Sequence, residues 1–80
     1  MPTVLRKEGF SFRIYLDDHI PAHVHAFKAE DEVKIQIGDD FEDCCLISVY
    51  GMNRKDAKRA LEIAIAHRMK LLNCWRKIHG

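Results

Sequence analysis

The apolar residues of this 80-residue chain change their spacing at Gly51-Met52-Asn53. Before this point they alternate with polar residues, which is the period of a half-buried β-strand. After it they recur every three or four positions, the period of an amphipathic helix. Each kind of element has one apolar face, and in so short a chain each needs the other to bury it. The sequence therefore predicts a single α+β domain over 1–80, with a β-rich half (1–50) and a basic amphipathic helix (53–79).

The first half predicts a four- or five-stranded, mostly antiparallel sheet, because short polar turns separate its apolar runs. The predicted strands are residues 3–7, a strand with Phe10, Phe12, Ile14 and Leu16 on one face, and residues 23–28, 33–37 and 44–50. One apolar face of this sheet would be covered by the long C-terminal helix.

The helix has clear signals at its start and one irregularity inside. Asn53 can cap it, with Asp56 as a weak capping box, and no Pro or Gly follows from Arg54 to His79. Arg68 falls in the apolar stripe, and an unpaired buried guanidinium is very costly. Arg68 must therefore either extend its guanidinium outward to solvent or pair with a carboxylate, for which we expect Asp17 or Asp18. A kink or split near His67-Arg68 is compatible with the pattern.

The net charge of +1 hides an uneven distribution. Residues 54–80 carry eight basic and two acidic side chains, a net +6, whereas residues 1–53 carry five basic and ten acidic ones, a net −5. We favour internal attraction between the halves over a basic surface for nucleic acid. In the second interpretation, Lys55, Lys58 and Arg59 would contact the phosphates.

The three cysteines are an odd number without a CxxC pair, so the sequence indicates no disulfide framework. The start turns charged before any apolar run long enough for a signal peptide, and no stretch approaches the roughly 20 apolar residues of a membrane span. These features predict a cytoplasmic protein without a membrane partner.

The segment from Asp17 to His25 holds three of the five histidines. On a strand, His23 and His25 would project from the same face, with His19 and Asp18 on the preceding loop. Three interpretations remain open. The residues can bind a divalent metal (zinc, iron or nickel) through His23 and His25 with His19 or Asp18, or act as general acid and base on a phosphodiester beside Arg13 or Arg68. They can also be purely structural. No other cofactor is expected.

Three segments together resemble a known family. They are Met1-Pro2-Thr3-Val4-Leu5-Arg6, Asp18-His19-Ile20-Pro21-Ala22-His23-Val24-His25, and the helical Leu71-Leu72-Asn73-Cys74-Trp75. They are similar to the small prokaryotic domain-of-unknown-function 4160 family, whose signature is Asp-His-x-Pro-x-His-Val-His. Arg68 matches a family arginine. The chain departs from the family at Ala22, where a second proline is more common, and over residues 42–52.

The resemblance implies a compact α+β domain. It also implies a gene paired with a second small family (domain of unknown function 2442), in an arrangement like toxin–antitoxin modules. Our leading expectation is a toxin-like component that acts on RNA, with a cognate small protein encoded nearby as its partner. Its candidate catalytic residues are His19, His23, His25, Arg68 and Asp18, and the first enzymatic candidate is a metal-independent endoribonuclease. The alternatives are a non-enzymatic regulator that binds RNA, DNA or protein, and a small metal-binding protein that uses His-x-His. A homo-oligomer is compatible with each.

Overall fold

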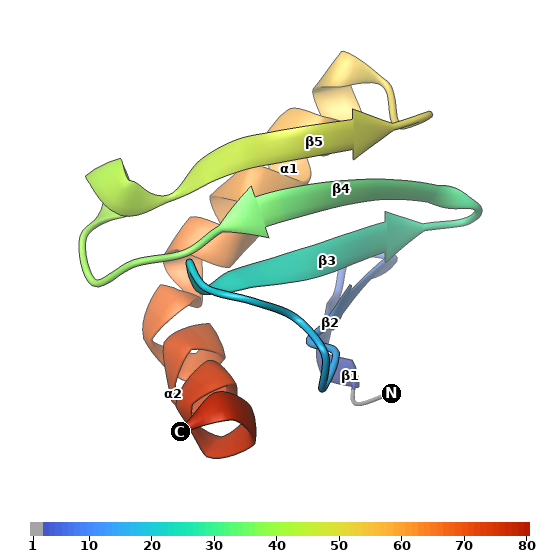
Figure 1. Cartoon of the computed structure of the whole chain (residues 1–80). Coiled ribbons are helices and arrows are strands. Elements are labelled where there is room, and N and C mark those ends of the chain that lie inside the picture. Colours follow the sequence, from blue (N-terminus) through green and yellow to red (C-terminus); the bar gives the residue numbers. More distant parts are fainter. Residues whose placement is uncertain (1–2) are drawn as a thin grey trace.

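The structure, a computed structural model, describes residues 3–80, which form a five-stranded antiparallel sheet and two C-terminal helices (Figure 1). The strands follow one another in space as they do in the sequence, and a short 3₁₀ helix, η1 (Phe41–Asp43), precedes the last one. Their bounds are β1 (Thr3–Lys7), β2 (Phe10–Arg13), β3 (His23–Lys28), β4 (Asp31–Gln36) and β5 (Cys45–Tyr50). The predicted α+β class is confirmed.

The first hairpin has the tight turn that its sequence predicts. Lys7 pairs with Phe10, so only Glu8 and Gly9 connect β1 and β2. Both have positive φ, 52° and 83°, as a type I′ turn requires. Gly9 adopts this conformation without strain because it has no Cβ.

The helical third forms two helices, α1 (Arg54–Ala66) and α2 (Arg68–His79), rather than one unbroken helix, so the split form of the prediction is confirmed. The chain leaves helical geometry at His67 (φ −111°, ψ 19°), next to the anticipated split at His67-Arg68. The bend lets two separate apolar faces reach the core. These faces consist of Ala57, Ala60, Ile63 and Ala64 in α1, and Leu71, Leu72 and Trp75 in α2.

The α1 cap is the one that the sequence predicts. Asn53 Oδ1 accepts a hydrogen bond from the Asp56 N–H at 2.8 Å, and Asn53 Nδ2 donates to Asp56 Oδ2 at 3.2 Å. We expect Asn53→Ala to lower the free energy of unfolding by about 1 kcal/mol, because an N–H at the helix start loses its partner. Urea denaturation measures this loss, and Asn53→Asp, which keeps a capping oxygen, should retain most of the stability. Equal stability of Asn53→Ala and wild type would contradict the prediction.

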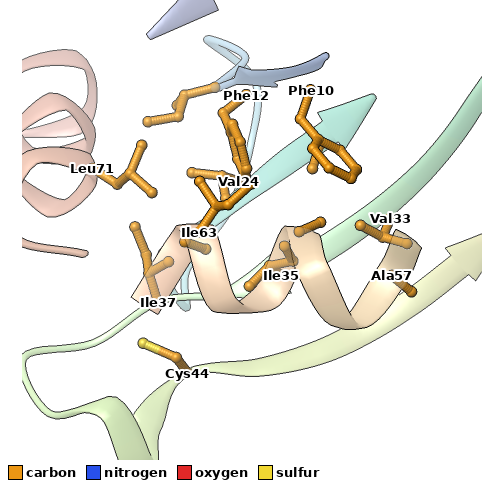
Figure 2. Close-up of a cluster of buried hydrophobic side chains, with 14 of the residues drawn as sticks. Phe10, Phe12, Val24, Val33, Ile35, Ile37, Cys44, Ala57, Ile63 and Leu71 are labelled. Carbon is orange, nitrogen blue, oxygen red and sulfur yellow. The ribbon is translucent and has the colours of Figure 1, made fainter. Parts of the chain in front are cut away.

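The core lies between the sheet and the helices (Figure 2). Phe12, Val24 and Ile35 extend from three neighbouring strands toward Ile63 of α1 and Leu71 of α2. Cys44, which follows η1, is buried at one end of this cluster, whereas Cys45, the first residue of β5, is exposed.

The expectation that Leu16 belongs to this core is wrong, since its side chain is 71% exposed. The strand that carries Phe10 and Phe12 ends at Arg13, although Ile14 is still buried. A turn follows, in which the Asp18 N–H donates to the Tyr15 carbonyl at 3.1 Å and the Tyr15 N–H donates to Asp18 Oδ2 at 2.9 Å. This turn carries Leu16 away from the sheet.

Ion pairs connect the helices with the first half of the chain, as internal charge attraction predicts. Arg59 pairs with Glu8, Lys28 lies 3.2 Å from Asp56, and Arg76 lies 3.5 Å from Asp39. All these pairs are at least partly exposed, so each contributes little to stability. Neither helix in residues 3–80 is long and apolar enough to cross a membrane.

Candidate metal centre

His23 and His25 lie side by side on β3, on the opposite side of the strand from Val24 and Ala26, which enter the core. Each histidine is only 7% exposed. The segment between β2 and β3 runs back alongside this strand (Figure 1) and brings Asp18 against both rings. A pair of histidines predicted from spacing alone is thus buried beside a carboxylate.

The distances in this cluster suit a metal ion. Asp18 Oδ1 lies 3.4 Å from His23 Nε2 and 3.1 Å from His25 Nε2, and all three ligand atoms lie within 4.8 Å of one another. Metal–ligand bonds of about 2.0–2.1 Å at tetrahedral angles place neighbouring ligand atoms about 3.3 Å apart. One ion therefore fits between Asp18, His23 and His25 with small adjustments of the side chains.

The other ring nitrogens have the partners that metal-binding histidines usually have. His23 Nδ1 lies 2.9 Å from the Pro21 carbonyl oxygen, and His25 Nδ1 lies 2.9 Å from Glu32 Oε2. Both acceptors require Nδ1 to carry the proton, so Nε2 is the nitrogen available to a metal. Both rings are therefore oriented before any ion binds.

Without a metal, the same atoms form a hydrogen-bond network. His25 lies between Asp18 and Glu32, so each of its ring nitrogens faces a carboxylate oxygen. Burial acts to raise the pKa of Asp18 and is the largest single influence on it. Hydrogen bonds from the Tyr15 N–H and from His25, together with the charges of His25 and His23, outweigh burial, so the pKa of Asp18 lies below its usual range.

Aromatic rings enclose the two histidines. The Tyr15 ring lies 4.7 Å from that of His25, and the Trp75 ring lies 5.4 Å from that of His23, between centroids. The ring of His79 lies 4.1 Å from that of Trp75, and its Nε2 lies 3.1 Å from the Tyr15 carbonyl oxygen. The end of α2 therefore closes one side of the site.

A surface hollow of about 300 Å³ opens beside the cluster. Asp18 and His23 form part of its wall, together with His19 and Lys34. The remaining lining residues are Asp17, Ile20, Pro21 and Ile47. His19 is exposed and lies outside the group of three converging ligand atoms, so the structure places Asp18, rather than His19, with His23 and His25.

Arg68 has different partners from those that the sequence predicted. Its Nε donates to the Asp39 carbonyl oxygen at 3.0 Å and its Nη1 to the Ile65 carbonyl oxygen at 2.8 Å. The predicted pairing with Asp17 or Asp18 is wrong, because main-chain oxygens beside the helix break satisfy the guanidinium. Arg68 is also not among the residues that line the hollow at the histidines.

The three basic residues considered for nucleic-acid contact lie elsewhere. Lys55, Lys58 and Arg59 line a separate hollow of about 460 Å³, together with Glu8 and other residues, and this hollow shares no lining residue with the first. Arg59 is engaged by Glu8 and Glu62. Only the two lysines of the set are therefore without an ion pair among the residues that the structure describes.

The fold and the site together define a small α+β domain with two histidines and one carboxylate at a surface hollow. The profile of one protein family, described as domain of unknown function (DUF4160), matches residues 9–76. The chain therefore belongs to this family, and the resemblance noted in the sequence is confirmed. The Met1-Pro2 part of that resemblance lies outside the described residues. No curated protein and no solved structure matches the chain.

Glu32 is the residue of this site that the sequence did not suggest. We expect Glu32→Gln to weaken binding of Zn²⁺ or Co²⁺ by about 10–100-fold, because the carboxylate fixes the His25 ring and raises the basicity of its Nε2. A competition titration with a chromophoric chelator measures the affinity. Glu30→Gln is the matched control, since Glu30 is exposed in the same hairpin. Unchanged affinity in Glu32→Gln would contradict the prediction.

The lowered pKa of Asp18 predicts sensitivity to acid. A carboxyl with a lower pKa in the folded chain contributes stability above its unfolded-state pKa, about 3.9, and this contribution is lost as the pH falls through the folded-state value. The metal-free protein should lose stability below about pH 4 more steeply than Asp18→Asn. Urea denaturation at several pH values tests this, with Asp17→Asn as the control. Parallel curves for wild type and Asp18→Asn would contradict it.

Proposed function

We propose that the protein binds one divalent transition-metal ion through Asp18, His23 and His25. The observation that carries the proposal is the convergence of these three ligand atoms, with both Nδ1 atoms already bound to acceptors. Nitrogen and oxygen ligands of this kind suit Zn²⁺, Fe²⁺ or Ni²⁺ rather than Mg²⁺ or Ca²⁺.

The hollow supports a reactive centre rather than a purely structural one. Structural zinc sites have four protein ligands, whereas three ligands leave a position for water or substrate. Asp18 and His23 are shared between the ligand group and the hollow wall, so this position would be reached from the hollow. The same wall carries Lys34 and His19 but also Asp17, so an anionic substrate would be held by Lys34 and the metal ion rather than by the net charge of the hollow.

Metal titration of untagged protein tests the proposal. Trp75 is the only tryptophan in the chain and its ring lies against that of His23, so paramagnetic Co²⁺ in the site should quench its fluorescence. We expect quenching that saturates at one equivalent, and strong loss of binding in His23→Gln and His25→Gln. His67→Gln is the matched control. Wild-type affinity in both ligand variants would overturn the proposal.

We further propose that this site belongs to a toxin-like component of a two-gene module that acts on RNA, with a cognate small protein as its partner. A metal ion in the site, together with Lys34 and the two histidines on the hollow wall, would offset the charges of Asp17 and Asp18 and supports a phosphodiester substrate. Since His25 is not among the residues that line the hollow and Arg68 lies elsewhere, a metal-assisted reaction replaces the metal-independent one as the favoured chemistry.

Expression of the chain in a bacterial host tests the toxin-like role. We expect arrest of growth that is relieved by the product of the neighbouring gene and abolished by His23→Ala or His25→Ala, with His67→Ala as control. Normal growth with abundant folded protein would overturn the toxin-like role. The metal-binding proposal would not be affected, because the Co²⁺ titration tests it separately.

RNA binding has its own readout. If Lys55 and Lys58 contact phosphates, their joint replacement by glutamine should lower the dependence of binding on salt by about two counterions. An unchanged salt slope would exclude this face, in which case the cluster remains a metal site in a regulator that does not use the basic helix.

A further inference from the structure

The strand β5 is an open edge of the sheet, and apart from a β-bulge at Ile47, where its pairing with β4 shifts register, it lacks the usual protection. It is the last strand in the spatial order, and its six residues, Cys45 to Tyr50, include no charged side chain. Leu46, Ile47, Val49 and Tyr50 are between 37% and 53% exposed. Edge strands of monomeric proteins are usually protected by charges or proline, as Arg6 and Lys7 protect β1 at the other edge.

The two ends of β5 carry opposite charges. The residues before the strand include Asp40, Glu42 and Asp43 around η1, and those after it include Arg54 and Lys55 at the start of α1. Figure 1 shows η1 at one end of the strand and the start of α1 at the other. Among residues 3–80, none of these five side chains has an ion-pair partner in the chain.

We propose that the protein forms a two-fold symmetric dimer through antiparallel pairing of β5 with β5 of a second copy. A two-fold axis at the middle of the strand brings the beginning of one β5 beside the end of the other. The acidic residues around η1 in each copy then lie beside Arg54, Lys55 and the positive N-terminus of α1 in the other copy. The two-fold symmetry produces this contact at both ends of the paired strands. A parallel pairing would bring like charges together instead, so the charge arrangement selects the antiparallel dimer.

Pairing in this way joins two five-stranded sheets into one of ten strands and covers the exposed apolar edge. The proposed dimer does not depend on metal binding. Ile47 of β5 lines the hollow beside His23, so the strand of the second copy would lie next to this wall of the hollow in the dimer.

Sedimentation velocity of the metal-free protein over a range of concentrations, at low ionic strength, tests the proposal. We expect a monomer–dimer equilibrium in wild type and only monomer in Val49→Lys, because the new charge lies on the pairing edge. Leu16→Lys is the matched control, since Leu16 is an exposed apolar residue away from β5, and it should dimerise like wild type.

Charge reversal separates this dimer from other forms of association. The pair Arg54→Glu and Lys55→Glu should weaken dimerisation by about tenfold or more, as should the pair Asp40→Lys and Asp43→Lys. Combining all four replacements should restore it. A wild type that stays monomeric at all concentrations, a dimer unaffected by Val49→Lys, or four replacements without recovery would overturn the proposal.

Discussion

Replacement of Asp18 by asparagine is expected to weaken binding of Zn²⁺ or Co²⁺ on the order of 100-fold or more, while the chain stays folded. Asp18 supplies the only negative charge among the three converging ligands, and its Oδ1 lies nearest to both imidazoles. An amide oxygen is a much poorer ligand for a divalent ion than a carboxylate. The same amide can still accept the Tyr15 N–H, so the turn that places residue 18 should persist.

Asp17→Asn is the control for this experiment. Asp17 is the preceding residue and lines the same hollow, but it is not part of the ligand group. A chelator competition titration should therefore give wild-type affinity for Asp17→Asn and a large loss for Asp18→Asn. Circular dichroism of both variants verifies the fold. Similar affinities in the two variants would mean that the hollow attracts cations through its general charge rather than through a metal site.

Proton competition provides a second test of the same centre. A metal that binds His25 Nε2 must displace the hydrogen bond that this nitrogen makes with Asp18. Protons compete with metal ions for imidazole and carboxylate ligands in general. Apparent metal affinity should therefore fall as the pH is lowered, and proton release should be detectable in a weakly buffered solution.

Much of the fold follows from side-chain periodicity. Alternation predicted β1 and β3 with their observed bounds, and Asn53 predicted the start of α1. The prediction from periodicity was wrong where the alternation of apolar residues continued beyond the end of a strand. Leu16 keeps the alternation of β2, but the hydrogen bonds between Tyr15 and Asp18 turn the chain first. This turn depends on a hydrogen bond between the Asp18 carboxylate and the Tyr15 N–H, and the spacing of apolar residues gives no information about such a bond.

The candidate site was predictable only in part, for a related reason. The pair His23 and His25 follows from a two-residue spacing, and Asp18 was named among the candidates. The sequence pattern predicts a turn at Glu32, between strands 23–28 and 33–37, whereas β4 begins at Asp31 and pairs His25 with Lys34. That register puts Glu32 diagonally across from His25. The expected carboxylate partner of Arg68 is wrong because main-chain carbonyl oxygens beside the helix break, which side-chain spacing does not record, accept its hydrogen bonds.

The most damaging core substitution should be Phe12→Ala. Phe12 is 0% exposed, lies in a central part of the sheet and extends toward both helices (Figure 2). Removing a buried phenylalanine ring costs about 3–5 kcal/mol, through lost transfer energy and the cavity left behind. A domain of this size has a free energy of unfolding near the low end of about 5–15 kcal/mol. The substitution should therefore remove most of the stability and lower the midpoint of urea denaturation by more than about 1 M.

Leu16→Ala is the informative control, because it separates the structure from the sequence pattern. The alternation of the chain assigns Leu16 to the same face as Phe12, whereas the structure leaves it 71% exposed. We expect its replacement to change the free energy of unfolding by no more than about 0.5 kcal/mol. Trp75, which is buried where α2 meets the histidines, reports unfolding of both variants by fluorescence. A loss in Leu16→Ala comparable with that in Phe12→Ala would mean that β2 extends beyond Arg13 in solution, and Asp18 would then lie away from the histidines.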